Sequence, residues 1–202
     1  MAVQDQVAAV INGERVPAAR TFQDLDPSTG QELAQVAAGG KEEIDAAVAA
    51  ARETYERDWR HRTVTERAEL LRRLASLIRR DAETLALTES QDTGKPLKQA
   101  RSDAETAARY FEFYADTAKA FHGEIIPAPT RDTLVLAIRD PYGVTGHIVP
   151  WNYPMQISAR TVAPALMTGN CCVLKPAEEA PLTAIRFGEL ALEAGLPPGA
   201  LN

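Results

Sequence analysis

Hydrophobic residues follow two different periods along this chain, first in short strand-like runs and then, from Glu42 on, at helical spacing. The runs Val7–Ile11 and Glu14–Val16 flank Asn12-Gly13, the dipeptide most typical of a two-residue β-hairpin. Phe22–Leu25 and Glu32–Ala37 are predicted to form two further strands on either side of a turn rich in Pro, Ser and Gly. The chain therefore opens with a small group of strands.

Four helices are predicted next. The first covers Glu42–Arg57, and the second begins at a capping box formed by Thr63 and Glu66. The third covers Asp81–Gln91, and the fourth runs from Pro96 to about Phe121. The apolar face of the second helix consists of Leu70, Leu71, Leu74, Leu77 and Ile78. Thr93-Gly94 separates the third helix from the fourth.

Two stripes of side chains on these helices invite a functional interpretation. The first consists of Arg72, Arg73, Arg79 and Arg80, and the second of Tyr110, Phe111, Phe113 and Tyr114. The arginines could bind an anion, but a solvated face paired with nearby acids fits the acidic chain better. The aromatic stripe is more typical of a core or a subunit contact than of a ligand site.

Glu124–Ile126 and Thr133–Arg139 are predicted to be strands that are too short to bury a face of their own. Two strands that protrude in this way need another sheet to complete them.

A strand, a rigid loop, a helix and a second strand follow between residues 143 and 175. Gly143–Val149 is the first strand, and the loop Trp151–Tyr153 lies between two prolines that restrict its backbone. Met155–Met167 is the helix, and Cys171–Leu174 is the second apolar strand. Ligands of open α/β sheets bind beyond the carboxyl ends of the strands, so we expect the chemistry there. Pro181–Ala194 forms a last helix, and the fold class is α/β.

Composition narrows the function classes. The chain has 202 residues, a net charge of −6, 45% apolar and 25% charged residues, which is typical of a globular domain. The acidic balance disfavours nucleic acid as a partner, and no apolar run is long enough for a membrane. Met1–Val10 shows no targeting signal, and adjacent Cys171 and Cys172 cannot form an ordinary disulfide. We therefore expect a cytoplasmic location and no membrane partner.

Six ordered blocks make the chain resemble the aldehyde dehydrogenase superfamily. They are Pro150–Pro154, Pro164–Leu166, Gly169-Asn170, Lys175–Glu178, Pro181–Thr183 and Glu193–Gly199. The resemblance covers essentially all of the chain and implies a Rossmann-like open-sheet cofactor domain with N-terminal helices and a protruding β oligomerisation arm. It implies residues 1–122 as the first part of the cofactor domain, 123–141 as the arm, and 142–202 as a nucleotide-binding segment that is incomplete at its C-terminus. A homodimer or homotetramer is expected.

The resemblance also assigns roles to individual residues. Asn152 would donate its amide N–H to the oxyanion of an aldehyde adduct, whereas from spacing alone it could be a turn asparagine. Lys175 and Glu178 are predicted to lie one helical turn apart after the second strand, and they would hold the adenosine ribose of NAD. A surface ion pair is the alternative without the resemblance. NADP is disfavoured because the Glu178 carboxylate would repel its phosphate. The backbone and ring contacts with the cofactor are assigned to Ile148, Pro150 and Trp151.

Other reactive side chains are interpreted as structural. Cys171 and Cys172 lie inside an apolar strand, and the nucleophile and general base of the family are absent from this sequence. The scattered histidines His61, His122 and His147 predict no metal site, and Ser158 has no nucleophile context. Thr161 stands where many family members carry a lysine near the catalytic water.

The sequence thus predicts the N-terminal part of an NAD(P)-dependent aldehyde dehydrogenase, inactive as 202 residues alone. The alternative is a non-catalytic binding or assembly module that retains the nucleotide crevice. The DNA downstream of Asn202 would distinguish the two, whereas nothing in the sequence identifies the aldehyde.

Overall fold

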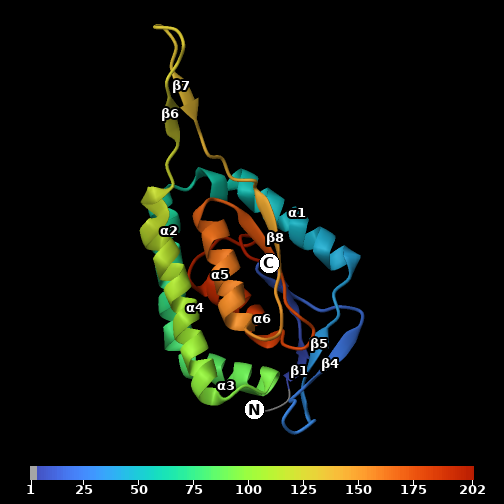
Figure 1. The fold of residues 1–202 in the computed structure, drawn as a ribbon. Helices are drawn as coiled ribbons and strands as arrows, with labels where there is room; N and C mark the ends of the chain where they lie inside the picture. Colours follow the sequence, from blue (N-terminus) through green and yellow to red (C-terminus); the bar gives the residue numbers. More distant parts are fainter. Residues whose placement is uncertain (1–3) are drawn as a thin grey trace.

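The computed structural model describes residues 4–202, which form nine strands and six α-helices. Two of the strands, β6 and β7, form a long hairpin that projects from one end (Figure 1). Residues 1–3 of Met1–Val10, the segment in which the sequence shows no targeting signal, lie outside this range. The strands are β1 (Gln4–Val7), β2 (Ala9–Ile11), β3 (Glu14–Val16), β4 (Thr21–Leu25), β5 (Glu32–Ala37), β6 (Glu124–Ile126), β7 (Val135–Ala137), β8 (Val144–Ile148) and β9 (Cys171–Lys175). The helices are α1 (Lys41–Arg57), α2 (Val64–Arg80), α3 (Ala82–Thr93), α4 (Leu97–Thr117), α5 (Pro154–Met167) and α6 (Leu182–Glu193), with short 3₁₀ turns η1 (Trp59–His61) and η2 (Ala118–Ala120).

The N-terminal strands confirm the predicted hairpin. Strands β2 and β3 are antiparallel, and Asn12 and Gly13 adopt φ angles of 51° and 79° that the tight turn requires. Strands β4 and β5 are also antiparallel. The small antiparallel layer that the resemblance implies is not antiparallel throughout, however, because β1 pairs in parallel with β5. Only strands joined by a short turn are forced to be antiparallel, and β1 is separated from β5 by three strands.

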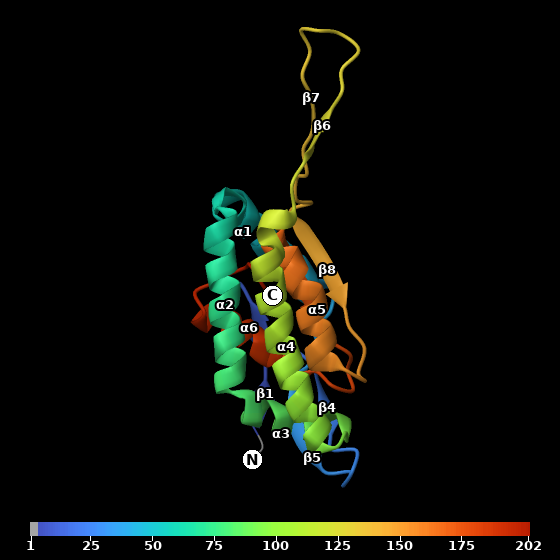
Figure 2. The ribbon, with the colours of Figure 1, turned by 60° about the vertical axis from the view of Figure 1, so that its left-hand side comes forward.

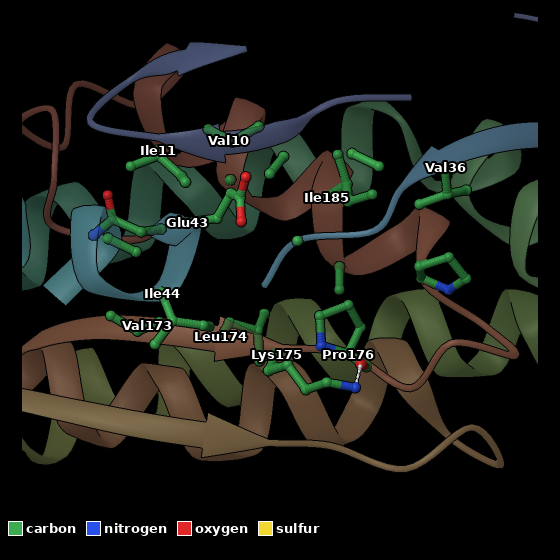
Figure 3. Close-up of a pocket in the computed structure, with 18 of the residues that line it drawn as sticks. Val10, Ile11, Val36, Glu43, Ile44, Val173, Leu174, Lys175, Pro176 and Ile185 are labelled. Atoms are coloured by element: carbon green, nitrogen blue, oxygen red, sulfur yellow. Dashed lines mark hydrogen bonds between the residues drawn. The ribbon is translucent and has the colours of Figure 1, made fainter. Parts of the chain in front are cut away.

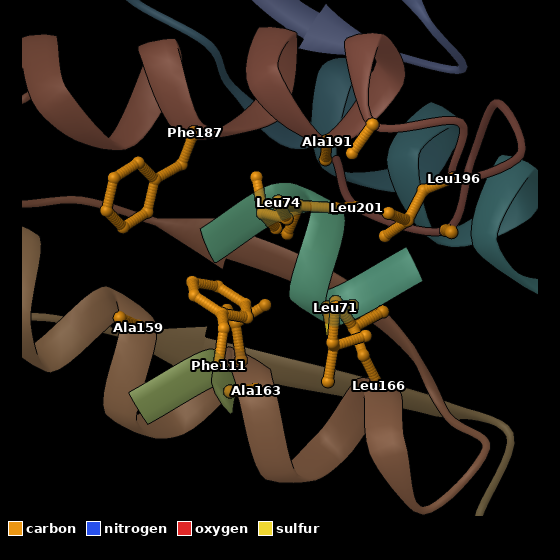
Figure 4. Close-up of a cluster of buried hydrophobic side chains, with 14 of the residues drawn as sticks. Leu71, Leu74, Phe111, Ala159, Ala163, Leu166, Phe187, Ala191, Leu196 and Leu201 are labelled. Atoms are coloured by element: carbon orange, nitrogen blue, oxygen red, sulfur yellow. The ribbon is translucent and has the colours of Figure 1, made fainter. Parts of the chain in front are cut away.

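The core lies where α2, α4, α5 and α6 meet (Figure 4). Leu71 and Leu74 of α2 are fully buried there, and the ring of Phe111 meets that of Phe187 edge to face with centroids 6.2 Å apart. Alanines such as Ala163 line the contact between α4 and α5, and small side chains allow helices to approach closely. Figure 2 shows α2 and α4 side by side along the length of this layer.

The aromatic stripe on α4 is divided between two environments. Phe111 is fully buried, whereas Phe113 is 58% exposed and leans edge to face on Tyr114. The face to which each residue belongs follows from the helical period, because Phe111 and Phe113 are two positions apart and point in different directions.

Three of the four arginines of the stripe on α2 pair with acids, as the interpretation of a solvated face predicted, and within residues 4–202 no ion pair involves Arg73. Arg72 binds Asp116 at 2.9 Å, and Arg79 binds Glu105 at 2.9 Å and Glu112 as well. Arg80 binds Asp81 at 2.7 Å and also Glu193 of α6. These surface ion pairs leave the stripe with little unbalanced positive charge for an anion.

The projecting hairpin is formed by β6 and β7, which pair over three residues each. The predicted second strand, Thr133–Arg139, is therefore longer than the observed one. Ile125 is 75% exposed and lies opposite Leu136 in the register. The hairpin is confirmed, and its role as an oligomerisation arm, like the division of the chain into three segments, stays a prediction.

Candidate active site

A parallel β–α–β unit of β8, α5 and β9 forms the framework of the site. The two strands pair in register from Val144 opposite Cys171 to Ile148 opposite Lys175, so their carboxyl ends lie at one edge. The continuous burial of Cys171–Val173 is typical of a parallel strand that is covered on both faces, here by α1 and α5. The predicted order of strand, loop, helix and strand is confirmed.

Asn152 lies in the loop that leaves this edge. The backbone N–H of Val149 donates to the carbonyl of Lys175 at 3.1 Å and ties the start of the loop to β9. Pro154 occupies the first position of α5, where its missing N–H and fixed φ are tolerated. Asn152 is exposed, and within residues 4–202 no hydrogen bond occupies its side-chain amide. The amide is therefore free to donate, and the role of Asn152 stays a prediction.

Lys175 and Glu178 meet at the end of β9. Their side chains form an ion pair at 2.7 Å. Lys175 Nζ also donates to the carbonyl of Pro176 at 3.0 Å (Figure 3). The hydrogen bond from Lys175 holds the pKa of Glu178 below its usual value, so the group is a carboxylate at neutral pH. The sequence placed these two residues one helical turn apart, which is wrong, because residues 176–179 form a loop with a turn and the next helix begins at Leu182. Two prolines flank this stretch, and the residue before a proline is disfavoured in helical conformation.

A largely apolar pocket of about 250 Å³ opens beside this ion pair (Figure 3). Lys175 and Glu178 line it together with Val36 of β5, Ile44 of α1 and Ile185 of α6. The last three come from elements far apart in the sequence, and no pattern along the chain indicated that they would meet.

The other predicted cofactor contacts lie outside this pocket. None of the four lines it. Ile148 is the last residue of β8, the strand beside β9, and Pro150, Trp151 and Asn152 follow that strand. Ile148 is 86% exposed and Trp151 is 57% exposed. Large apolar side chains that remain open beside an ion pair at the strand ends fit a ligand with both flat apolar and polar parts, such as a dinucleotide.

Neither cysteine can act as a nucleophile at this site. Both are buried at the start of β9, and burial raises the pKa of each thiol to about 12. Ser158 is likewise fully buried in α5, and Thr161 bonds back to the Ile157 carbonyl at 3.0 Å.

Across residues 4–202, no group of three or more His, Cys, Asp and Glu side chains is arranged to hold a metal ion. No helix in the same range is long and apolar enough to span a bilayer.

The fold defines a protein of the α/β class with polar side chains at the carboxyl ends of its parallel strands, where such proteins bind their ligands. Residues 15–202 match the model of the aldehyde dehydrogenase family. The chain is 43% identical over 196 residues to the Escherichia coli NADP/NAD-dependent aldehyde dehydrogenase PuuC, covering 95% of this chain and 39% of that protein. It is 45% identical over 197 residues to the mitochondrial aldehyde dehydrogenase family 2 member B4 of Arabidopsis thaliana, covering 96% of this chain and 36% of that protein.

Solved structures agree with this match. The NAD-dependent aldehyde dehydrogenase of Sinorhizobium meliloti superposes with a TM-score of 0.95 at 35% identity, covering 99% of this chain and 41% of that one. The chain belongs to the aldehyde dehydrogenase family, and it spans about two fifths of the length of these relatives.

Proposed function

We propose that this chain is the N-terminal, cofactor-binding part of an NAD(P)-dependent aldehyde dehydrogenase that oxidises an aldehyde to a carboxylate. The observation that carries the proposal is the free amide of Asn152 beyond β8, one strand away from the Lys175–Glu178 ion pair beyond β9. An uncharged donor and a ribose-binding pair at one edge suit the two halves of this reaction, carbonyl activation and nucleotide binding.

Asn152 has the electrostatic role in this mechanism. Attack of a thiolate on the aldehyde turns the carbonyl oxygen into an oxyanion, and a fixed N–H donor stabilises this charge as it develops. An amide serves well because it donates without losing a proton and brings no charge of its own. The thiolate and the general base must come from outside residues 1–202, since both cysteines here are buried and protonated.

Lys175 and Glu178 would bind the cofactor, which supplies the two-electron acceptor of the reaction. The ammonium group can donate to ribose hydroxyls, and the carboxylate can accept from two of them. We propose NAD as the cofactor in preference to NADP, because a 2′-phosphate would place a second anion beside Glu178. The relative from E. coli carries both cofactors in its name, so the family as a whole allows either.

We further propose that the arm of β6 and β7 joins copies of the complete protein into a homodimer or homotetramer in the cytoplasm. The exposed apolar pair of Ile125 and Leu136 supports a protein partner for the hairpin.

The burial of Cys171 and Cys172 favours a second candidate function, a non-catalytic nucleotide-binding or assembly module. The reading frame downstream of Asn202 distinguishes the two functions. A continuation that encodes a cysteine nucleophile and a glutamate base supports the enzyme, whereas a stop codon supports the module.

The direct test of the enzyme is Asn152→Ala in the complete polypeptide that contains this chain. Loss of one oxyanion donor is expected to lower kcat by about a hundredfold to a thousandfold, or about 3–4 kcal/mol, with little change in Kd for NAD. Steady-state kinetics give kcat, and NADH fluorescence gives the affinity. Gln31→Ala, an exposed amide in the turn before β5, is the matched control and should change neither quantity. A normal kcat for Asn152→Ala, with hydride transfer or deacylation shown to be rate-limiting, would remove Asn152 from the mechanism.

A further inference from the structure

A buried cluster of charges lies under the loop that carries Asn152, on elements that the proposed reaction does not use. Lys95 Nζ contacts Glu89 Oε1 at 2.6 Å and Asp103 Oδ2 at 2.8 Å. The carboxylate side chains are fully buried, and that of Lys95 is 10% exposed. We call Glu89, Lys95 and Asp103 the buried triad.

With both carboxylates ionised, the triad holds one negative charge in excess, which is costly in a protein interior. Burial raises the pKa of Glu89 to about 7 in spite of its contact with Lys95. Burial also acts on Asp103, but hydrogen bonds from Lys95, Gln99 and Gln156 outweigh it and hold the pKa below its usual value. An apolar core of the same volume is often no less stable than such a cluster, so stability alone does not account for these charges.

The contacts that the triad makes indicate its role. The ammonium group of Lys95 lies 4.6 Å from the centre of the Tyr153 ring, the residue that follows Asn152. Glu89 Oε2 accepts from the backbone N–H of Met155 at 3.2 Å. Asp103 Oδ1 accepts from Gln156 Nε2 at 2.6 Å. Each member of the triad thus binds a different residue between Tyr153 and Gln156.

These contacts act at the start of α5. Pro154 has no N–H, so the Met155 N–H is the first donor of the helix, and no residue of the helix itself can accept from it. A carboxylate at this end also interacts favourably with the helix dipole. Asn152 itself is exposed, and the residues that follow it connect its loop to the triad.

The triad is assembled by a break between two helices. Gly94 ends α3 with φ of 72°, and a Cβ there would lie 2.8 Å from Pro27 Cγ, so glycine is required. Ser90 Oγ donates to the carbonyl of Lys95 at 2.7 Å and fixes the backbone from which the lysine side chain extends. Glu89 and Asp103 come from the two helices on either side of the break.

We propose that Glu89, Lys95 and Asp103 are positioning residues that fix the Trp151–Tyr153 loop against the start of α5 and so keep the Asn152 amide aimed at the reacting carbonyl. This inference rests on the proposed function of Asn152. The reason for such a device is that a small misplacement of a catalytic group can cost up to about a hundredfold in rate.

The first test replaces Lys95 in the complete enzyme. Lys95→Met is expected to lower kcat about tenfold and to leave KM for the aldehyde and Kd for NAD within about twofold. Lys95→Arg keeps the cation and should restore most of the rate. Lys98→Met, an exposed lysine on α4 close to Lys95 in sequence, is the matched control and should have no effect. A normal kcat for Lys95→Met would overturn the inference.

Lys95→Met leaves two buried carboxylates without their cation and can prevent folding. Gln156→Leu is then the working variant, because it removes the bond between Asp103 and α5 and leaves both ion pairs intact. We expect kcat to fall at least about threefold, with normal thermal unfolding. An unchanged kcat in this variant would equally contradict the inference.

A double-mutant cycle separates positioning from general stability. If the triad acts through Asn152, Lys95→Met or Gln156→Leu should change kcat by less than about twofold in the Asn152→Ala background. Additive losses would overturn the positioning role and leave the proposed function standing. A normal kcat for Asn152→Ala alone would instead overturn the proposed function, so the two failures can be told apart.

Hydrogen exchange gives a readout that needs no catalysis. In the complete enzyme, the amides of residues 151–153 and 155–157 should exchange at least about threefold faster in Gln156→Leu than in the parent, because the loop has lost a hydrogen bond to the interior. Amides in α2 serve as the internal reference and should not change. Unchanged exchange in residues 151–157 would show that the triad does not hold the loop.

Discussion

Cys171 and Cys172 are adjacent in the sequence and lie at the start of β9, where α1 and α5 cover both faces of the strand. Their burial separates them from solvent and from any substrate at the strand ends. The same burial that stabilises β9 also suppresses their chemistry, because the nucleophilic form of cysteine is the thiolate.

We therefore predict that the 202-residue chain alone oxidises no aldehyde and that its thiols react slowly. With the pKa of both thiols near 12, only about one in ten thousand is a thiolate at pH 8. The rate at which the thiols are alkylated should therefore rise with pH until the pH reaches the pKa. Iodoacetamide labelling followed by mass spectrometry measures this rate, and the denatured chain is the control that should be labelled fast. Aldehyde-dependent NADH production that is abolished by replacing either cysteine would contradict the prediction.

Glu178 is the residue on which the cofactor preference should depend. Its carboxylate can accept charge-assisted hydrogen bonds from ribose hydroxyls, each worth about 1.5–3 kcal/mol, whereas a 2′-phosphate in the same place would be repelled. In the complete enzyme, Glu178→Ser should shift the ratio of kcat/KM for NAD over NADP towards NADP by about tenfold. Glu179→Ser, an exposed neighbour in the same loop, should leave the ratio unchanged. The ribose assignment fails if both variants keep the ratio of the parent.

At the scale of an element, α2 illustrates how closely a sequence signal can determine a helix start. Thr63 Oγ1 accepts from the Glu66 N–H at 3.2 Å, and Glu66 Oε2 accepts from the Thr63 N–H at 2.7 Å. This confirms the predicted capping box, which satisfies donors that the first turn of a helix leaves without partners.

Removing this cap should destabilise the fold measurably, because α2 contributes Leu71 and Leu74 to the core. Thr63→Ala is expected to lower the free energy of unfolding by about 1 kcal/mol. Thr65→Ala, an exposed threonine two residues into the same helix, is the control and should cost much less. Urea unfolding followed by circular dichroism measures both. Equal effects of the two substitutions would show that the cap contributes nothing.

At the scale of the whole molecule, the hairpin of β6 and β7 projects away from the rest of the chain (Figures 1 and 2). Its apolar side chains, Ile125 and Leu136 among them, are exposed. A two-stranded hairpin is marginally stable alone in water. A partner surface that covers Ile125 and Leu136 would stabilise it.

We predict that charge on this hairpin weakens assembly of the complete protein. Ile125→Asp combined with Leu136→Asp should shift the molecular mass measured by sedimentation towards the monomer, because two buried carboxylates would have no partners in the interface. Thr130→Asp, an exposed position outside the paired strands, is the control and should leave the mass unchanged. An assembly unaffected by the double substitution would place the interface elsewhere.

Much of the secondary structure could be predicted because its signals are local. The Asn12-Gly13 turn, the capping box at Thr63 and the prolines around Asn152 restrict the backbone within a few residues, and each element formed where it was expected. The error at Lys175 and Glu178 has the opposite origin. Their spacing fits a helix, and flanking prolines kept the segment in a loop.

The sequence by itself determined the family, the order of strands and helices, and the residues that follow each strand end, because these depend on neighbours along the chain. Only the tertiary structure brought Val36, Ile44 and Ile185 to one pocket, turned β1 parallel to β5, and placed Lys95 beneath Tyr153. Each of these contacts joins residues from separate elements, and burial decides which charges and apolar groups meet. Lys95 follows the glycine that ends α3, a position typical of a surface residue, and only folding buries it between two acids.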